Sequence, residues 1–185
     1  MKVKTKLKSL FTWSTEELVL IGTFAALIKI VTLTVSLVGG GMNPATLLLK
    51  NIVATAMLVV LIHKVPRAGV LVLYVLQQAI IMMMLMGSGI MILPGYLLAA
   101  IFAETLAFLV GGYRNTAAII LGVAFYDLAS RVISMGMSWL FMRENMALFF
   151  VALGIVGVGY IGCLIGLGTG IKFVKEFRHA GFIRR

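Results

Sequence analysis

The sequence has few of the residues from which soluble domains build polar surfaces, disulfides or metal sites. Only 12% of its 185 residues are charged, whereas 62% are hydrophobic, and a soluble domain of this composition would expose large apolar patches to water. There is a single cysteine, Cys163, which excludes an internal disulfide and a multi-cysteine metal site. No polar, Pro-rich or Ser-rich stretch is long enough to form a second, soluble domain. The composition therefore indicates an integral membrane protein.

The sequence does contain six apolar segments separated by short polar connections. We predict an all-α integral membrane protein with six transmembrane helices in one bundle over residues 1–185, because each segment approaches the roughly 20 residues that a span needs. The first segment is too long for a signal peptide and lacks a small-residue cleavage site, so we expect it to be retained. Ser14 and Glu17 predict a capping box before it, and Pro44 and Pro94 fall in first turns. The predicted helices cover about residues 16–38, 44–63, 68–86, 90–111, 116–140 and 147–173.

The distribution of the 16 Lys and Arg residues predicts the orientation of the bundle. Only Arg143 falls in a connection on one side of the predicted membrane. Because cytoplasmic loops carry the excess of Lys and Arg, we predict that both termini are cytoplasmic. The net charge of +10 does not indicate nucleic-acid binding, because no basic face alternates with aromatic side chains. The residues on the cytoplasmic side are Lys2, Lys4, Lys6, Lys8, Lys64, Arg67, Arg114, Lys172, Lys175, Arg178, Arg184 and Arg185.

Five charged residues fall at least six positions inside the ends of the predicted spans: Lys29, Lys50, Glu104, Asp127 and Arg131. A charge at the bilayer centre costs about 2.5–3.5 kcal/mol on insertion scales, so such residues usually face a cavity or a partner. Three cations and two anions leave one positive charge, and we hypothesise that a carboxylate or phosphate of a ligand balances it. Two other interpretations remain open. Asp127 and Arg131 are four residues apart and could pair within their helix, and either lysine could extend its stem toward the membrane surface.

Two neutral amides, Gln77 and Gln78, fall at mid-depth in the third predicted span. Adjacent residues point about 100° apart on a helix, so at most one of them easily faces a given cavity. Hydrogen bonding between helices is the favoured role for these amides. Gln77 is nevertheless included among the candidate ligand contacts.

Glycines are concentrated in the sixth predicted span. Gly157, Gly159 and Gly162 match the GxGxxG pattern, but a dinucleotide site requires a preceding strand, and here the pattern lies inside a long apolar segment. Gly162, Gly166 and Gly170 instead share one helical face, and small residues at this spacing let helices approach closely in lipid. They predict either packing within the bundle or contact with another subunit.

No catalytic constellation is recognisable in the sequence. The HExxH and GxSxG patterns are absent, and His63 and His179 are isolated near predicted helix ends. The segment from Asp127 to Arg131 is faintly similar to the aspartate motif of membrane phosphotransferases, but it lacks the further aspartates that such a motif needs one and two turns downstream. We therefore expect no enzymatic activity, no cofactor and no metal.

Two short segments resemble the S components of energy-coupling factor (ECF) transporters, in particular the Trep_Strep group. The C-terminal part, from Ile161-Gly-Cys-Leu-Ile-Gly to Lys175-Glu-Phe-Arg-His-Ala-Gly-Phe182, is similar to the glycine-rich last helix and basic-aromatic tail of that group. The segment from Ala103-Glu104 to Gly111-Gly-Tyr-Arg114 is similar to the end of its fourth helix. Six helices, short connections and the absence of an ATPase motif also resemble this family.

The resemblance implies the substrate-binding subunit of an ATP-driven importer in a bacterial cell membrane. S components capture a vitamin or similar micronutrient from outside and deliver it through a coupling transmembrane subunit that carries two ATPase subunits. A small-residue pair on the first helix docks on the coupling subunit, which corresponds here to Gly22 and Ala26. The ligand site of the family includes the loop between the first two helices, here residues 39–43, which adds Asn43 to the candidates.

The candidate ligand contacts are therefore Lys29, Asn43, Lys50, Gln77, Glu104, Asp127 and Arg131. Two alternatives to an S component remain. The chain could be a stand-alone, gradient-driven transporter of a small solute, or a non-transporting accessory subunit in the membrane. The sequence itself does not identify the ligand.

Overall fold

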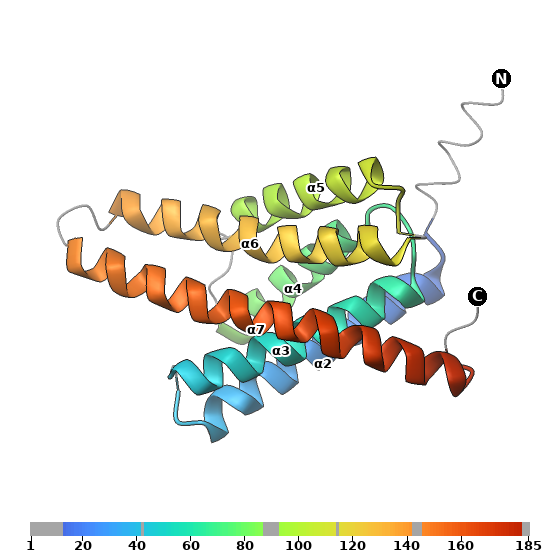
Figure 1. The fold of residues 1–185 in the computed structure, drawn as a ribbon, viewed down its shortest axis with the longest axis horizontal. Coiled ribbons are helices and arrows are strands. Elements are labelled where there is room, and N and C mark those ends of the chain that lie inside the picture. The colour runs from blue at the N-terminus through green and yellow to red at the C-terminus, as the bar shows by residue number, and fades with distance from the viewer. Residues whose placement is uncertain (1–12, 42, 87–92, 114, 142–145, 183–185) are drawn as a thin grey trace.

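The computed structural model describes residues 13–41, 43–86, 93–113, 115–141 and 146–182, which form six α-helices and no strand (Figure 1). Most helix ends lie within a few residues of the predicted limits, which confirms the all-helical membrane fold. The clear difference is the last helix, which continues past residue 173 to His179. The helices are α2 (Thr15–Val38), α3 (Pro44–Lys64), α4 (Val70–Met86), α5 (Leu93–Leu109), α6 (Thr116–Phe141) and α7 (Met146–His179).

Within the described residues, four helical segments are long and apolar enough to cross a membrane: Thr15–Val38, Pro44–Lys64, Thr116–Gly136 and Phe150–His179. Helices α4 and α5 have 17 residues each, at the lower limit for a span. In Figure 1 their hairpin stops short of the end that α6 and α7 reach. Large apolar side chains remain exposed on the helices, among them Val38 and Leu109 at 84% and 85%. Such a surface is suited to lipid rather than to water.

Two capping boxes fix the starts of α2 and α3. The Ser14 hydroxyl accepts the Glu17 N–H at 3.2 Å, and the Glu17 carboxylate accepts the Ser14 N–H at 3.0 Å, which confirms the predicted box. Asn43 and Thr46 form the second box, with Pro44 as the first helical residue. These contacts satisfy N–H groups that have no partner inside a helix.

The C-terminal end of α7 turns back on itself at Gly181. This glycine has a φ of 77°, in the left-handed region where side chains are disfavoured. The N–H of Phe182 then donates to the carbonyl of Phe177 at 2.9 Å, and the two rings meet edge to face with centroids 6.2 Å apart. The Phe182 carbonyl also accepts a hydrogen bond from the Lys64 ammonium group of α3. The tail is thereby held against the end of a second helix.

Helix α5 ends in the same way. Gly111 has a φ of 118°, and the N–H of Gly112 donates to the carbonyl of Ala107 at 2.8 Å. The Tyr113 ring then packs on Phe108 with centroids 6.4 Å apart. Both ends carry the hydrogen bonds of a Schellman motif, in which a glycine reverses the chain so that the last carbonyls keep partners.

Helices α3 and α7 make the most extensive contact in the described bundle, and the glycines of α7 permit it. A Cβ added at Gly162 would lie 2.8 Å from the Leu48 carbonyl oxygen, and one added at Gly166 would lie 2.7 Å from that of Ile52. A Cβ at Gly170 would lie 3.1 Å from the Cα of Ala56. These three glycines therefore serve packing within the bundle, as the first of the two interpretations predicted.

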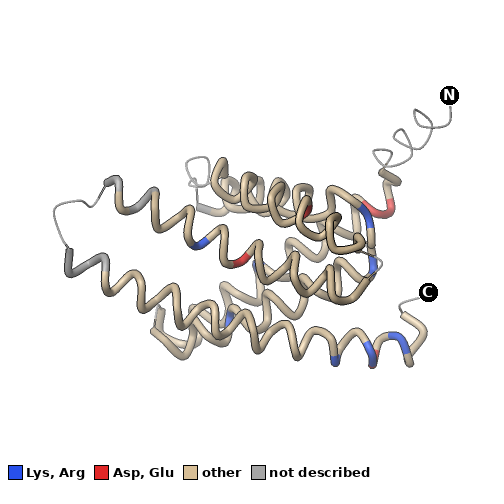
Figure 2. The backbone as a smooth tube through the Cα atoms, turned by 45° about the horizontal axis from the view of Figure 1, so that its top comes forward, with Lys and Arg blue, Asp and Glu red and all other residues tan. Residues whose placement is uncertain are grey.

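Charged residues gather at the end of the bundle where α2 begins and α7 ends (Figure 2). Arg67 and Glu17 form an ion pair there at 2.9 Å. The arrangement places the start of α2 and the end of α7 on one side of the bundle, while the cytoplasmic orientation of the termini stays a prediction. Eight of the basic residues named for the topology lie outside the described part of the chain: Lys2, Lys4, Lys6, Lys8, Arg114, Arg143, Arg184 and Arg185.

Candidate functional site

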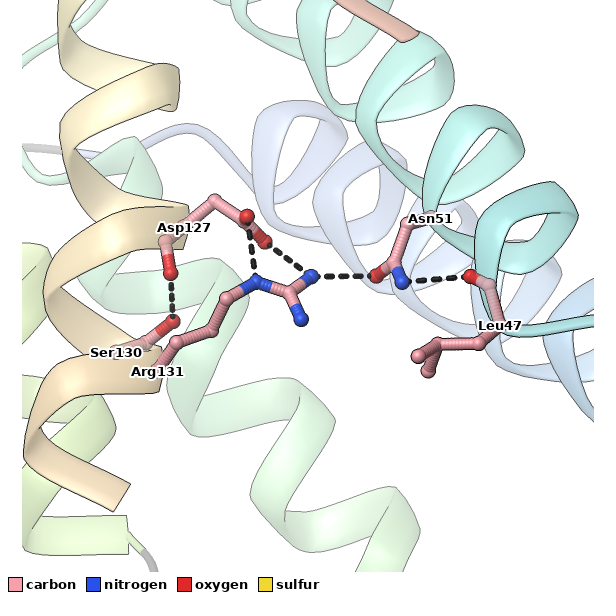
Figure 3. Close-up of polar contacts among 5 residues, drawn as sticks. All are labelled: Leu47, Asn51, Asp127, Ser130 and Arg131. Carbon is pink, nitrogen blue, oxygen red and sulfur yellow. Dashed lines mark hydrogen bonds and ion pairs between the residues drawn. The ribbon is translucent and has the colours of Figure 1, made fainter. Parts of the chain in front are cut away.

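An ion pair lies inside the bundle on α6. The Arg131 guanidinium donates from Nε to Asp127 Oδ2 at 2.7 Å and from Nη2 to Oδ1 at 3.0 Å (Figure 3). Their side chains are only 16% and 19% exposed. Because they are four residues apart, one turn of helix holds them in this two-point contact. The pairing within the helix that the sequence allowed is therefore formed.

The same guanidinium reaches across to α3. Arg131 Nη2 donates to Asn51 Oδ1 at 2.7 Å, and Asn51 Nδ2 donates to the Leu47 carbonyl at 2.6 Å (Figure 3). The amide orientation of Asn51 is thereby set by two partners. Sequence reasoning missed Asn51, although a polar amide within an apolar span was the signal that drew attention to Gln77.

Helix α7 leaves room for the guanidinium at Gly159. A Cβ at this position would overlap Arg131 Nη1 and would lie 2.8 Å from Arg131 Cζ. Gly159 thus has a local role that neither the rejected GxGxxG pattern nor the face formed by Gly162, Gly166 and Gly170 had suggested. The side chain of Arg131 lies between α6, α3 and the backbone of α7.

A cavity of about 290 Å³ opens beside this network. Its lining comes from α3, α4, α5 and α6. Apolar residues such as Leu58 and Val123 form part of the wall, next to the Asp127–Arg131 pair. The polar side chains that line it are Lys50, Asn51, Thr55, Asp127, Ser130 and Arg131.

A second cavity of about 250 Å³ adjoins the first. Lys29 of α2 and Gln78 of α4 are its polar residues apart from tyrosines, and its wall is otherwise apolar. Three tyrosines line both cavities: Tyr74 of α4, Tyr96 of α5 and Tyr126 of α6. We call the two spaces the Lys50 cavity and the Lys29 cavity.

The two lysines have no counter-ion in the described part of the chain. Neither ammonium group forms a hydrogen bond or an ion pair there, whereas Lys50 lies within electrostatic range of both Lys29 and Arg131 and is repelled by them. The Asp127 carboxylate is already engaged at both oxygens by Arg131. The two cavities together therefore carry a positive charge that the described residues do not balance.

The carboxylate of Glu104, a residue of α5, lies at the start of α4 and lines neither cavity. Its carboxylate accepts the N–H groups of Gly69 at 2.7 Å, Leu71 at 2.8 Å and Val72 at 3.3 Å. An anion in this position satisfies unpaired donors of the first turn and interacts favourably with the helix dipole. The structure thus gives Glu104 a structural partner rather than a place near a ligand.

The two glutamines separate as their spacing predicted. Gln78 lines the Lys29 cavity and donates to the Ala25 carbonyl of α2 at 2.6 Å. Gln77 instead faces α2, where its Nε2 lies 3.3 Å from the Leu18 carbonyl. Both glutamines therefore bond to α2, and only Gln78 also lines a cavity.

The remaining candidates lie away from the cavity linings. Asn43 caps α3 and also donates to the Gly39 carbonyl at 2.6 Å. Gly22 faces α4, since a Cβ there would lie 3.6 Å from the Gln77 Oε1, and Ala26 is half-buried one turn further along α2. Docking of this pair on another subunit stays a prediction. No group of three His, Cys, Asp or Glu side chains suited to a metal ion occurs among the described residues.

The comparison with known families identifies the chain as a bacterial membrane protein. A family described as hypothetical bacterial integral membrane protein (Trep_Strep) matches residues 15–150. The chain belongs to this family. No curated protein and no solved structure matches it significantly. The Trep_Strep match covers Lys29, Lys50, Asn51 and the Asp127–Arg131 pair, whereas Gly159 lies beyond it, so the cavity is built mostly from the part that defines the family.

Proposed function

We propose that this Trep_Strep protein is the substrate-binding S component of an ECF-type importer. It captures a vitamin or similar micronutrient from outside and delivers it through a coupling transmembrane subunit with two ATPase subunits. The chain itself catalyses no reaction and needs no cofactor in this role. Its energy comes from the partner module, since the sequence contains no nucleotide-binding motif.

The observation that carries the proposal is the pair of adjoining cavities inside the bundle. Polar residues converge there from α2, α3, α4 and α6, and Lys29 and Lys50 have no counter-ion in the described chain. Ligand sites are concave and mostly apolar, with a few placed polar groups that fix orientation. Unbalanced charge inside a membrane is costly, so a bound anion offers a physical reason for these lysines. The resemblance at both glycine-capped helix ends supports the assignment to S components.

The roles of individual residues follow from their contacts. Arg131 is held by Asp127 and Asn51, so it is a preorganised positive wall of the Lys50 cavity, and little side-chain freedom is lost when a ligand binds. Lys50, whose ammonium group has no partner in the described chain, supplies a second cation at the wall of the same cavity. The exposed apolar surface of the helices allows the whole bundle to tilt in lipid against a coupling subunit, which would present the site to the cytoplasm.

Co-purification from native membranes, followed by native mass spectrometry, tests the proposal. An S component is expected to appear with one coupling subunit and two ATPases and to carry a small bound mass. The variant Lys50→Gln should keep the partner subunits and lose the small mass, while Lys172→Gln on the exposed end of α7 should change neither. Reconstituted vesicles should then take up substrate only when the partner module and ATP are present. Uptake by the bare chain would instead identify a stand-alone carrier, and a complex without uptake would identify an accessory subunit.

A further inference from the structure

The distribution of charge over the two cavities restricts what can fill them. Arg131 and Asp127 balance each other at the edge of the Lys50 cavity. Lys50 lines only that cavity, and Lys29 lines only the adjoining one. Each cavity therefore contains one lysine without a counter-ion among the described residues. A ligand with a single negative charge would leave one lysine unbalanced in a membrane interior, where an unpaired charge is costly.

The tyrosines between the lysines provide a second, independent observation. Tyr74, Tyr96 and Tyr126 line both cavities, and none of their hydroxyls forms a hydrogen bond within the described chain. Buried tyrosines usually find such a partner; Tyr74 is only 7% exposed, Tyr126 is half-buried, and Tyr96 is 37% exposed. Three unused hydroxyls on the shared wall of two cavities point to a ligand that lies across that wall.

The apolar lining describes the middle of the same ligand. Around Lys29 the wall consists of Val75, Ala79, Met82 and Leu93 together with the tyrosine rings. Aromatic faces and a flexible thioether are suited to a flat apolar body. With volumes of about 250 and 290 Å³, the two cavities together match the size of an ordinary small-molecule site. A bare inorganic anion would fill only one end.

We propose that the ligand is a water-soluble dianion with an acidic group at each end of a flat apolar body: one acid beside Lys50 and Arg131, the other beside Lys29, with the body against Tyr74, Tyr96 and Tyr126. This inference rests on the proposed function, because it treats the cavities as the substrate site. It adds the charge of the ligand, the placement of its two acidic groups at opposite ends, and its orientation across the two cavities.

The test uses the full chain in detergent and three probes of defined charge, measured by isothermal titration calorimetry. The probes are naphthalene-2,6-dicarboxylate, with an acid at each end, naphthalene-2-carboxylate, with one, and naphthyl phosphate, with both charges at one end. The dicarboxylate should bind in the millimolar range or better, and at least tenfold more tightly than either other probe, because each added charge-assisted hydrogen bond contributes at least about tenfold.

Lysine variants locate the two acids. Lys29→Gln and Lys50→Gln should each weaken dicarboxylate binding at least about tenfold. Each should also reduce the ratio of the dicarboxylate affinity to the monocarboxylate affinity. Lys172→Gln, an exposed lysine on α7, serves as the matched control and should bind like the unchanged protein. Without ligand, the melting temperature of both cavity-lysine variants should be no lower than that of the unchanged protein. This measurement separates loss of a ligand contact from loss of the fold.

Several results would overturn the inference. These are equal affinity for the mono- and dicarboxylate, absence of dicarboxylate binding, tighter binding of the phosphate than of the dicarboxylate, or a co-purified ligand that is neutral or a lipid. These outcomes would not test the import role, which depends on co-purification of the protein with its partner subunits. Conversely, the protein could bind the dicarboxylate through both lysines and yet never associate with a coupling subunit. That result would support the dianion site and contradict the import role.

Discussion

Replacing Gly159 by alanine should break the polar network of the site from the side of α7. The added methyl would overlap Arg131 Nη1 and lie 2.8 Å from Arg131 Cζ, so the guanidinium must move. The movement should first break the hydrogen bond from Arg131 Nη2 to Asn51 Oδ1, which is 2.7 Å long. The contact with Asp127 should survive longer, because Asp127 lies on the same helix and can follow the Arg131 side chain.

The magnitude follows from two opposing effects. A hydrogen bond to a charged group contributes about 1.5–3 kcal/mol, whereas alanine in a helix is favoured over glycine by about 0.5–1 kcal/mol. The expected result is a net destabilisation of about 1–2 kcal/mol. It can be measured as the free energy of unfolding in a detergent–SDS titration, followed by far-ultraviolet circular dichroism.

The matched control is Gly157→Ala on the same helix. A Cβ at Gly157 meets nothing within 4 Å, so this variant should gain about 0.5–1 kcal/mol from helix propensity alone. In a background that carries both Asp127→Asn and Arg131→Gln, the shorter Gln side chain removes the overlap, and Gly159→Ala should stabilise like the control. Equal stabilisation by Gly159→Ala and Gly157→Ala in the unchanged background would refute the role assigned to Gly159.

Four further substitutions test other contacts by the same unfolding titration. Asp127→Asn should destabilise by about 2 kcal/mol, because it leaves Arg131 without its carboxylate partner; an unchanged midpoint would contradict the ion pair. Lys50→Met should stabilise the ligand-free protein by about 1 kcal/mol by removing an unbalanced charge, and a loss of stability would show that Lys50 has an internal partner. Glu104→Gln should cost about 1–2 kcal/mol through weaker binding of the α4 N-terminus, with faster hydrogen exchange confined to the first turn of α4. Gly166→Val should cost about 1–3 kcal/mol, since a Cβ there lies 2.7 Å from the Ile52 carbonyl oxygen; a smaller loss than Gly157→Val would refute the close α3–α7 approach.

The helices could be predicted from the sequence because lipid leaves the backbone few choices. In a bilayer core each N–H and C=O must find a partner within the protein, so a long apolar segment becomes a helix almost regardless of its residues. The extra length of α7 was missed because Lys175 and Arg178 were interpreted as a tail. Charges end the membrane-buried part of a segment, but they do not end a helix that continues beyond the hydrocarbon.

The candidate site was predictable only where charge marked it. Lys50, Asp127 and Arg131 do line one cavity, and their charge and spacing were visible in the sequence. Asn51 and Gly159 were missed because an amide or a glycine inside a span can have several structural roles, and only the position of the neighbouring helix decides between them. The tyrosines were missed for the same reason, since aromatic residues are ordinary components of apolar spans.

Glu104 shows the converse difficulty. A carboxylate in an apolar span signals that something nearby is positive, but a helix N-terminus meets that need as well as a ligand or a lysine does. Sequence order alone places Glu104 far from Gly69 and Leu71, and only the packing of α5 against α4 brings the carboxylate to these N–H groups. The difference between a ligand contact and a structural cap lies in that tertiary placement.

The segments that carry the resemblance to S components have a structural function in this protein. At the end of α5 and at the end of α7, a glycine reverses the chain and an aromatic ring packs back on a phenylalanine five positions earlier, Tyr113 on Phe108 and Phe182 on Phe177. Such ends fix where a helix stops and how it meets its neighbour, whatever the bundle binds. The side chains that line the cavities belong to no recognisable motif, since Lys29 and Lys50 lie singly within apolar helices. Likeness at the helix ends therefore supports a shared architecture, while the ligand is decided by a few isolated positions. Relatives with the same helix ends but neutral residues in place of these two lysines should bind ligands without acidic groups.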